Sequence, residues 1–134
     1  MQNNSETILT ANTHPGGGTT ETVTGEKFKG DGYYGRSDGL HTIQINLSGF
    51  LGDIEMQGTL AVNPTADDWF TVILGSGQTI DTTGKIVSAT TSKLEYTANE
   101  TSSKAYNLTG NYVWIRIYVS NWTDGTVNSI QLNH

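Results

Sequence analysis

Hydrophobic and polar residues alternate over short stretches of this chain, which is the pattern of β-strands rather than helices. The clearest case is residues 111–120, NYVWIRIYVS, where one face consists of valine and isoleucine and the other of aromatic and polar side chains. β-Branched and aromatic residues favour strands, so this stretch predicts a long strand inside a sheet. Asp124-Gly125 is a hairpin signal and residues 126–132 resume a strand pattern, so we expect the chain to end in a β-hairpin.

Further strand patterns recur at intervals bounded by turn residues. They cover residues 40–48, 53–60, 69–74, 86–89 and 93–97. The joint at residues 49–52 is short enough for a second hairpin, and no stretch of the length of a helix shows helical spacing. The sequence therefore predicts an all-β protein, an antiparallel β-sandwich of jelly-roll type.

The first 25 residues differ from the rest because they are polar and rich in glycine and threonine, with Pro15-Gly-Gly-Gly18 in their middle. Such a segment buries little apolar surface by itself, so it is either mobile or ordered by a neighbour. We therefore divide the chain into a flexible, extended arm, residues 1–25, and a single β-sandwich domain, residues 26–134.

The composition limits the kinds of molecule that the chain is expected to bind. The chain has 134 residues, no cysteine and a net charge of −6. Absence of cysteine excludes disulfides and thiolate metal sites. No basic stripe is present to bind nucleic acid, and no apolar run is long enough to span a membrane. The N-terminus lacks the pattern of a secretory signal, so we expect synthesis in a host cytoplasm and no nucleic-acid or membrane partner.

Groups that could carry catalysis are scattered. The histidines at positions 14, 41 and 134 have no short spacing that would prepare a metal site, and His41 fits an ordinary strand residue. Gly35-Arg-Ser-Asp-Gly39 has the spacing Gly-x-Ser-x-Gly, but no helix is predicted to follow it as a nucleophile elbow requires, so no activated nucleophile is indicated. We therefore expect a protein that is not an enzyme and that has no metal site and no cofactor.

Two acidic patterns leave alternatives open. Asp67 and Asp68 could form a glycosidase carboxylate pair with Asp53, Glu55 or Asp81. Residues 63–68 are more simply a turn in which aspartate accepts backbone N–H bonds. Asp31, Asp38 and Asp124 are candidate calcium ligands, although the stretch from Asp31 to Asp38 lacks the alternating oxygen donors of an EF-hand.

Aromatic residues in predicted loops are the best candidates for binding. Tyr33 and Tyr34 lie in a loop with four glycines, and Trp122 lies in the expected hairpin turn, where rings stack on sugars or anchor protein partners. The candidate docking or glycan-binding residues are Tyr33, Tyr34, Arg36 and Trp122. Trp122 could instead fold back to close one end of the sandwich, and we expect Trp69 and Trp114 in the core.

The order of these segments resembles a small β domain of tailed-phage virion proteins, particularly those of T4-like marine phages. The resemblance covers roughly residues 30–132. It rests on residues 31–44, 52–60, 68–70, 110–117 and 125–130. The first of these ranges resembles the entry to the opening strand of such domains. The next two resemble a unit of a glycine, an alternating strand, an acidic turn and a tryptophan, and the last two resemble the closing hairpin.

The resemblance implies a non-enzymatic β-sandwich that decorates a capsid or serves as a neck or tail accessory subunit in the virion. We expect such a subunit to dock on the particle surface through the arm of residues 1–25 and the loop that contains Tyr33 and Tyr34. It implies other virion proteins as partners and no catalytic residues to carry over. Exposed sheet edges favour a homo-oligomer, for which we prefer a trimer. The alternative is a carbohydrate- or receptor-binding module of a fibre or adhesin, with a glycan as its ligand.

Overall fold

The computed structural model describes residues 5–35, 39–80 and 82–133, and most of them lie in strands. The elements are β1 (Ser5–Leu9), β2 (Asn12–Thr13), β3 (Glu21–Thr24), β4 (Phe28–Lys29), β5 (Leu40–Thr59), η1 (Ala66–Asp68), β6 (Phe70–Val72), β7 (Leu74–Ile80), β8 (Ile86–Thr91), β9 (Leu94–Thr109) and β10 (Trp114–Asn133). The prediction of an all-β, antiparallel protein is confirmed.

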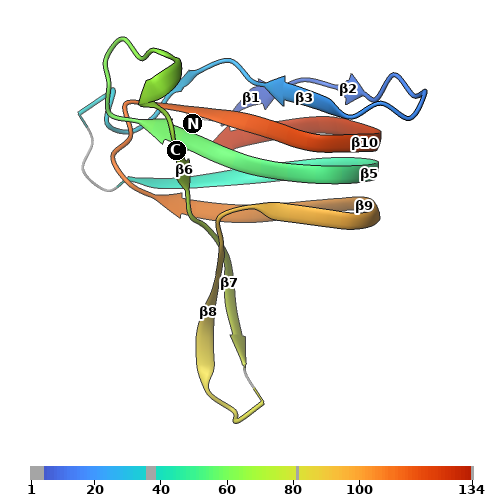
Figure 1. The fold of residues 1–134 in the computed structure, drawn as a ribbon. Coiled ribbons are helices and arrows are strands. Elements are labelled where there is room, and N and C mark those ends of the chain that lie inside the picture. The colour runs from blue at the N-terminus through green and yellow to red at the C-terminus, as the bar shows by residue number, and fades with distance from the viewer. Residues whose placement is uncertain (1–4, 36–38, 81, 134) are drawn as a thin grey trace.

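The described strands form one ten-stranded sheet that curls into a half-barrel, instead of the two separate sheets of a jelly-roll sandwich (Figure 1). The sheet has the order β1-β10-β5-β9-β7-β8. Its centre is made of three long strands, since β5 pairs with β10 along one side and with β9 along the other. All three bend near their middle, so the two halves of the sheet face each other (Figure 1).

Both predicted hairpins are wrong, because the glycine signals mark bends in continuous strands. The two halves of β10 pair with β5 and not with each other, from Trp114↔Thr59 to Asn133↔Thr42. Their register shifts around Asp124, as expected for a bulge. Gly125 has φ +83° and Gly49 has φ +61°. Glycine with a positive φ occurs both in β-bulges at bends and in tight turns. The Asp124-Gly125 dipeptide alone therefore does not distinguish a bend from a hairpin turn.

The N-terminal segment lies along the outer edge of β10 and follows its bend. β1, β2, β3 and β4 pair in turn with β10, starting from Ser5↔Asn133 and ending at Trp114↔Lys29. Ile8 and Leu9 are only 3% and 8% exposed. Residues 5–25 of the segment predicted to be mobile or ordered by a neighbour thus lie along another strand of the same chain.

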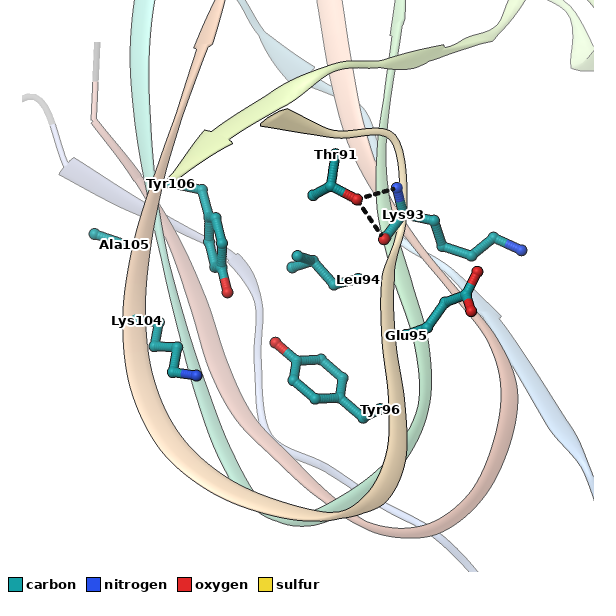
Figure 2. A pocket seen from close by; sticks show the side chains of 8 residues that line it. All are labelled: Thr91, Lys93, Leu94, Glu95, Tyr96, Lys104, Ala105 and Tyr106. Carbon is teal, nitrogen blue, oxygen red and sulfur yellow. Dashed lines mark hydrogen bonds between the residues drawn. The ribbon is translucent and has the colours of Figure 1, made fainter. Parts of the chain in front are cut away.

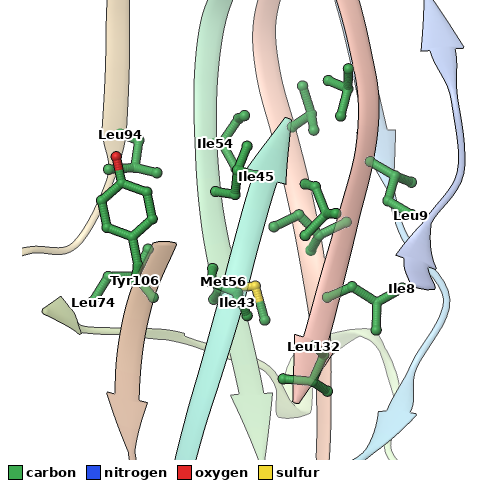
Figure 3. Close-up of a cluster of buried hydrophobic side chains, with 14 of the residues drawn as sticks. Ile8, Leu9, Ile43, Ile45, Ile54, Met56, Leu74, Leu94, Tyr106 and Leu132 are labelled. Atoms are coloured by element: carbon green, nitrogen blue, oxygen red, sulfur yellow. The ribbon is translucent and has the colours of Figure 1, made fainter. Parts of the chain in front are cut away.

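The hydrophobic core fills the space between the two halves of the curled sheet (Figure 3). Alternate residues of a strand point to the same face, so one face of β5 supplies Ile43 and Ile45 before the bend and Ile54 and Met56 after it. The buried apolar residues are Ile8, Leu9, Ile43, Ile45, Leu47, Phe50, Ile54, Met56, Val72, Leu74, Leu94, Tyr106, Leu108, Ile115, Ile117, Val119, Trp122, Val127, Ile130 and Leu132.

The apolar run at residues 69–74 does not form the single strand that was predicted. β6 pairs with β5 through Met56↔Val72, the chain then leaves this pairing at Ile73, which is 55% exposed, and β7 begins at Leu74. β7 and β8 pair with each other and form a hairpin that stands away from the half-barrel (Figure 1).

Candidate functional site

The loop at residues 30–35 is tied to the start of β10 by backbone hydrogen bonds. Gly30 and Gly32 donate their N–H groups to the carbonyls of Val113 and Tyr112, each at 2.9 Å. A Cβ at Gly32 would meet the backbone oxygen of Asn111, so only glycine permits this approach. The loop therefore presents its tyrosines from a fixed position.

His41 supports this loop from inside the protein. Its side chain is fully buried, Nε2 accepts the N–H of Asp31 at 3.1 Å, and Nδ1 lies 2.9 Å from the carbonyl oxygen of Gly39. Because Nε2 is an acceptor, the neutral tautomer with the proton on Nδ1 satisfies both contacts. His41 thus has a structural role in the strand. It contacts Asp31 within the loop and Gly39 next to the start of β5.

A His41→Leu variant is expected to lose about 2 kcal/mol of unfolding free energy, because a buried N–H and a buried carbonyl lose their partner. His41→Asn should lose less, since its amide can still donate to Gly39. Urea denaturation gives the free energies, and amide exchange of Tyr33 and Tyr34 should accelerate more in the leucine variant. Equal stability of the leucine variant and the unmodified protein would contradict this role.

Tyr33 and Tyr34 lie on the outer face, beside Trp114 and two lysines. The ring centroids are 5.5 Å apart for Tyr33 and Tyr34 and 5.1 Å apart for Tyr33 and Trp114. Lys29 Nζ lies 4.6 Å from the Tyr33 ring centre and Lys27 Nζ lies 4.5 Å from that of Trp114. We call these five residues the aromatic–lysine surface. A hollow of about 290 Å³ beside it is lined partly by Tyr34, Lys27, Lys29 and Trp114.

The prediction that Trp69 and Trp114 belong to the core is wrong. Both are half-buried, and neither is among the core residues. Trp114 Nε1 donates to the carbonyl of Val62 at 2.9 Å, and the guanidinium of Arg116 lies 4.2 Å from the Trp69 ring centre. Trp114 and Arg116 alternate with the buried Ile115 along β10, which places them on its outer face.

Among the candidate binding residues that the structure describes, Trp122 does not lie with Tyr33 and Tyr34. Tyr33 and Tyr34 are 44% and 50% exposed, as a docking surface requires. Trp122 is 3% exposed and its Nε1 donates to the carbonyl of Asp124 at 3.0 Å, so it closes one end of the fold, which was the alternative. Arg36 lies outside the described residues.

A second concave site, which the sequence analysis missed, lies between the two halves of the bent strand β9 (Figure 2). It has a volume of about 530 Å³ and is lined by Thr91, Lys93, Leu94, Glu95, Tyr96, Lys104, Ala105 and Tyr106. We call it the β9 hollow. In Figure 2 the hydroxyl groups of Tyr96 and Tyr106 both lie within it. Burial, with a further contribution from Tyr106, raises the pKa of Tyr96, so its phenol stays protonated.

Two of the acidic residues that were considered for a glycosidase carboxylate pair, Asp68 and Asp53, accept hydrogen bonds from nearby groups. Asp68 Oδ2 accepts the N–H and hydroxyl of Thr65 at 2.7 and 3.1 Å, as the turn interpretation predicts. Asp53 accepts the side-chain amide of Asn121 at 2.7 Å. Within the described residues, no three histidine or acidic side chains are grouped as a metal site would require. No helix in the same part of the chain is long and apolar enough to cross a membrane.

Comparison with known proteins gives one informative likeness. No protein-family model matches the chain, and no curated protein matches it. The structure is similar to the crystal structure of the SPBc2 prophage-derived protein YomS, with a TM-score of 0.51 and 14% sequence identity. The match covers 99% of this chain and 96% of that chain, so the two share their fold over nearly the full length.

Proposed function

We propose that this chain is a non-enzymatic structural protein of a tailed-phage virion, a capsid decoration or a neck or tail accessory subunit. Two independent likenesses support a phage origin: the fold shared with a prophage-derived protein and the segment order that resembles phage virion domains. The docking role rests on one observation, the exposed aromatic–lysine surface. We assign this surface to contact with other virion proteins.

The chemistry of this surface fits a protein partner. Exposed tyrosines beside a tryptophan are frequent anchors of protein interfaces, and their fixed loop reduces the entropy lost on binding. Lys27 and Lys29 make this surface locally basic in a chain whose net charge is −6. We therefore expect the complementary surface of the partner to be acidic.

The exposed apolar area extends beyond these five residues. Leu60 and Val62, in the segment that follows β5, are both 66% exposed, and the Val62 carbonyl is bound by Trp114. Phe70 is 44% exposed and its ring lies 5.6 Å from that of Tyr112. Contiguous apolar residues of this kind on a small domain indicate an interaction site.

The N-terminal arm contributes less to docking than the sequence suggested. Residues of β1 to β4 are hydrogen-bonded to β10, and Ile8 is buried. Exchange of the arm onto a neighbouring subunit would break these bonds. We therefore assign docking to the aromatic–lysine surface and leave the arm in its own subunit.

A carbohydrate- or receptor-binding module of a fibre or adhesin is the second candidate. The exposed rings of Tyr33 and Tyr34 favour it, because rings of this kind stack on sugars, and Lys27 and Lys29 would select acidic ones. A glycan array with the purified protein separates the two candidates. Binding of an acidic glycan that the Tyr34→Ala substitution abolishes would favour the second.

The virion assignment predicts that mass spectrometry of purified particles detects the protein. A Tyr33→Ala/Tyr34→Ala double variant, supplied to particles lacking the unmodified protein, is expected to show about tenfold lower incorporation, because loss of two anchors weakens docking.

The control is Tyr118→Ala, which removes a half-buried tyrosine ring of β10 that lies outside the aromatic–lysine surface. It should incorporate normally. Absence of the protein from particles would contradict the virion role, whereas normal incorporation of the double variant would contradict only the docking surface.

A further inference from the structure

The β7–β8 hairpin extends from the half-barrel into solvent (Figure 1). Its strands pair with each other from Leu74↔Thr91 to Ile80↔Ile86. A two-stranded hairpin without a third strand or a packed face is marginally stable in water. Residues 74–91 also include only two charged side chains, Asp81 and Lys85, where a solvated arm would normally carry more. These features indicate that the hairpin packs against another surface.

The edge of β9 next to this hairpin is open. In the described part of the chain, β9 is paired along its length with β5 on one side, but on the other side only Asn107 is paired, with Gly75 of β7. The backbone of residues 94–106 therefore presents unpaired N–H and carbonyl groups on that side. An edge of this length is a template for an added strand.

The β9 hollow lies at this same edge and provides the packing surface that an added hairpin needs. Leu94 and Tyr106 are 9% and 8% exposed, and the half-buried ring of Tyr96 faces the same space. Lys93 and Lys104 already have carboxylate partners, Asp53 at 3.7 Å and Glu100 at 3.3 Å. The hollow therefore offers apolar and hydroxyl groups with largely balanced charge, which suits a hairpin rich in threonine and β-branched residues.

We propose that the β7–β8 hairpin of a second copy of this chain lies in the β9 hollow and adds a strand to the open edge of β9. The hairpin and the hollow lie at one edge, so a rotation axis beside that edge places the hairpin of each copy over the hollow of another. Within one chain the hairpin extends away from the half-barrel (Figure 1), and only Thr91, at the base of the hairpin, lines the hollow. The proposal specifies the surface through which the proposed virion subunit would form its homo-oligomer.

Cysteine cross-linking tests this contact directly, because the chain contains no cysteine. Thr82, in the hairpin turn, and Lys104, at the rim of the hollow, are both exposed. The variants Thr82→Cys and Lys104→Cys are mixed and oxidised mildly, and disulfide-linked pairs are separated by mass. We expect the mixed pair to form at least tenfold more than the pair of Thr82→Cys with Thr42→Cys, an exposed position on the outer face of β5.

Amide hydrogen exchange of the unmodified protein supplies a second measurement that does not depend on a variant folding. Dilution that dissociates the oligomer should speed exchange at edge amides of residues 94–106. A chain that stays monomeric in light scattering at all concentrations, or equal yields of the two disulfide pairs, would overturn the proposal. Because these experiments use the purified chain alone, their failure leaves the particle experiment unaffected.

Discussion

A Gly125→Ala variant is expected to lose about 4 kcal/mol or more of unfolding free energy and to be largely unfolded at physiological temperature. Gly125 has φ +83°, a conformation that alanine adopts only with strain. An added Cβ would also meet the backbone carbonyl of Gly49 and lie 2.6 Å from Phe50 Cα. These are backbone atoms at the bend of β5, so no flexible side chain can move aside to relieve the contact.

Gly49→Ala is the matched control for this variant. Gly49 lies at the same corner with φ +61°, but no atom lies within 4 Å of its added Cβ. This substitution therefore carries only the conformational strain, about 1 kcal/mol. Guanidinium denaturation followed by circular dichroism measures both. Similar losses for the two glycines would show that close packing of β5 and β10 at the corner does not limit stability.

These glycines also explain why the strands were predictable and their connection was not. The alternation that predicted strands at residues 40–48, 53–60 and 111–120 depends on burial of one face, and that burial is the same in a hairpin and in a folded sheet. Whether β10 turns back on itself or continues past Gly125 is decided by its pairing with β5. At the bend those partners lie more than seventy residues away in sequence, as in Asp124↔Leu51 and Thr126↔Ser48, and local signals contain no information about them.

Local and long-range contacts also differ in how far they make the site residues predictable. Tyr33 and Tyr34 were predictable because several glycines mark an exposed loop around them. The β9 hollow was not, because Tyr96 and Tyr106 come together only when β9 bends between them. The outer position of Trp114 was predictable, because it alternates with Ile115 along the strand and therefore lies on the opposite face. Its large apolar ring favours burial, which is why a core position was expected.

The bends of the sheet are held together by aromatic rings from separate parts of the chain. Trp122 of β10 is stacked with Phe50 of β5, with 6.2 Å between ring centroids, and meets His14 edge-on at 5.4 Å. Phe50 in turn meets Tyr96 of β9 at 5.8 Å. The three long strands and the N-terminal segment thus each place one ring at the corner, and Trp122 contacts two of the other three.

A Trp122→Ala variant is therefore expected to lose about 3–5 kcal/mol of unfolding free energy, the cost of a large cavity in a core. The carbonyl of Asp124 would also lose the donor that lies 3.0 Å from it. Trp122→Phe should lose about half as much, since it keeps a ring against Phe50 but not the hydrogen bond. Tyr34→Ala, on the exposed surface, should change stability by less than about 0.5 kcal/mol.

Because Trp122 contacts both Phe50 and His14, its loss should loosen the N-terminal segment as well as the bends. Amides in β2 and β3, which flank His14, are expected to exchange faster in Trp122→Ala at denaturant concentrations where β5 and β10 remain paired. A loss of stability with unchanged exchange in β2 and β3 would mean that the N-terminal segment is held by its backbone pairing with β10 alone. In that case the aromatic rings at the bends would stabilise only the curled sheet of β5, β9 and β10.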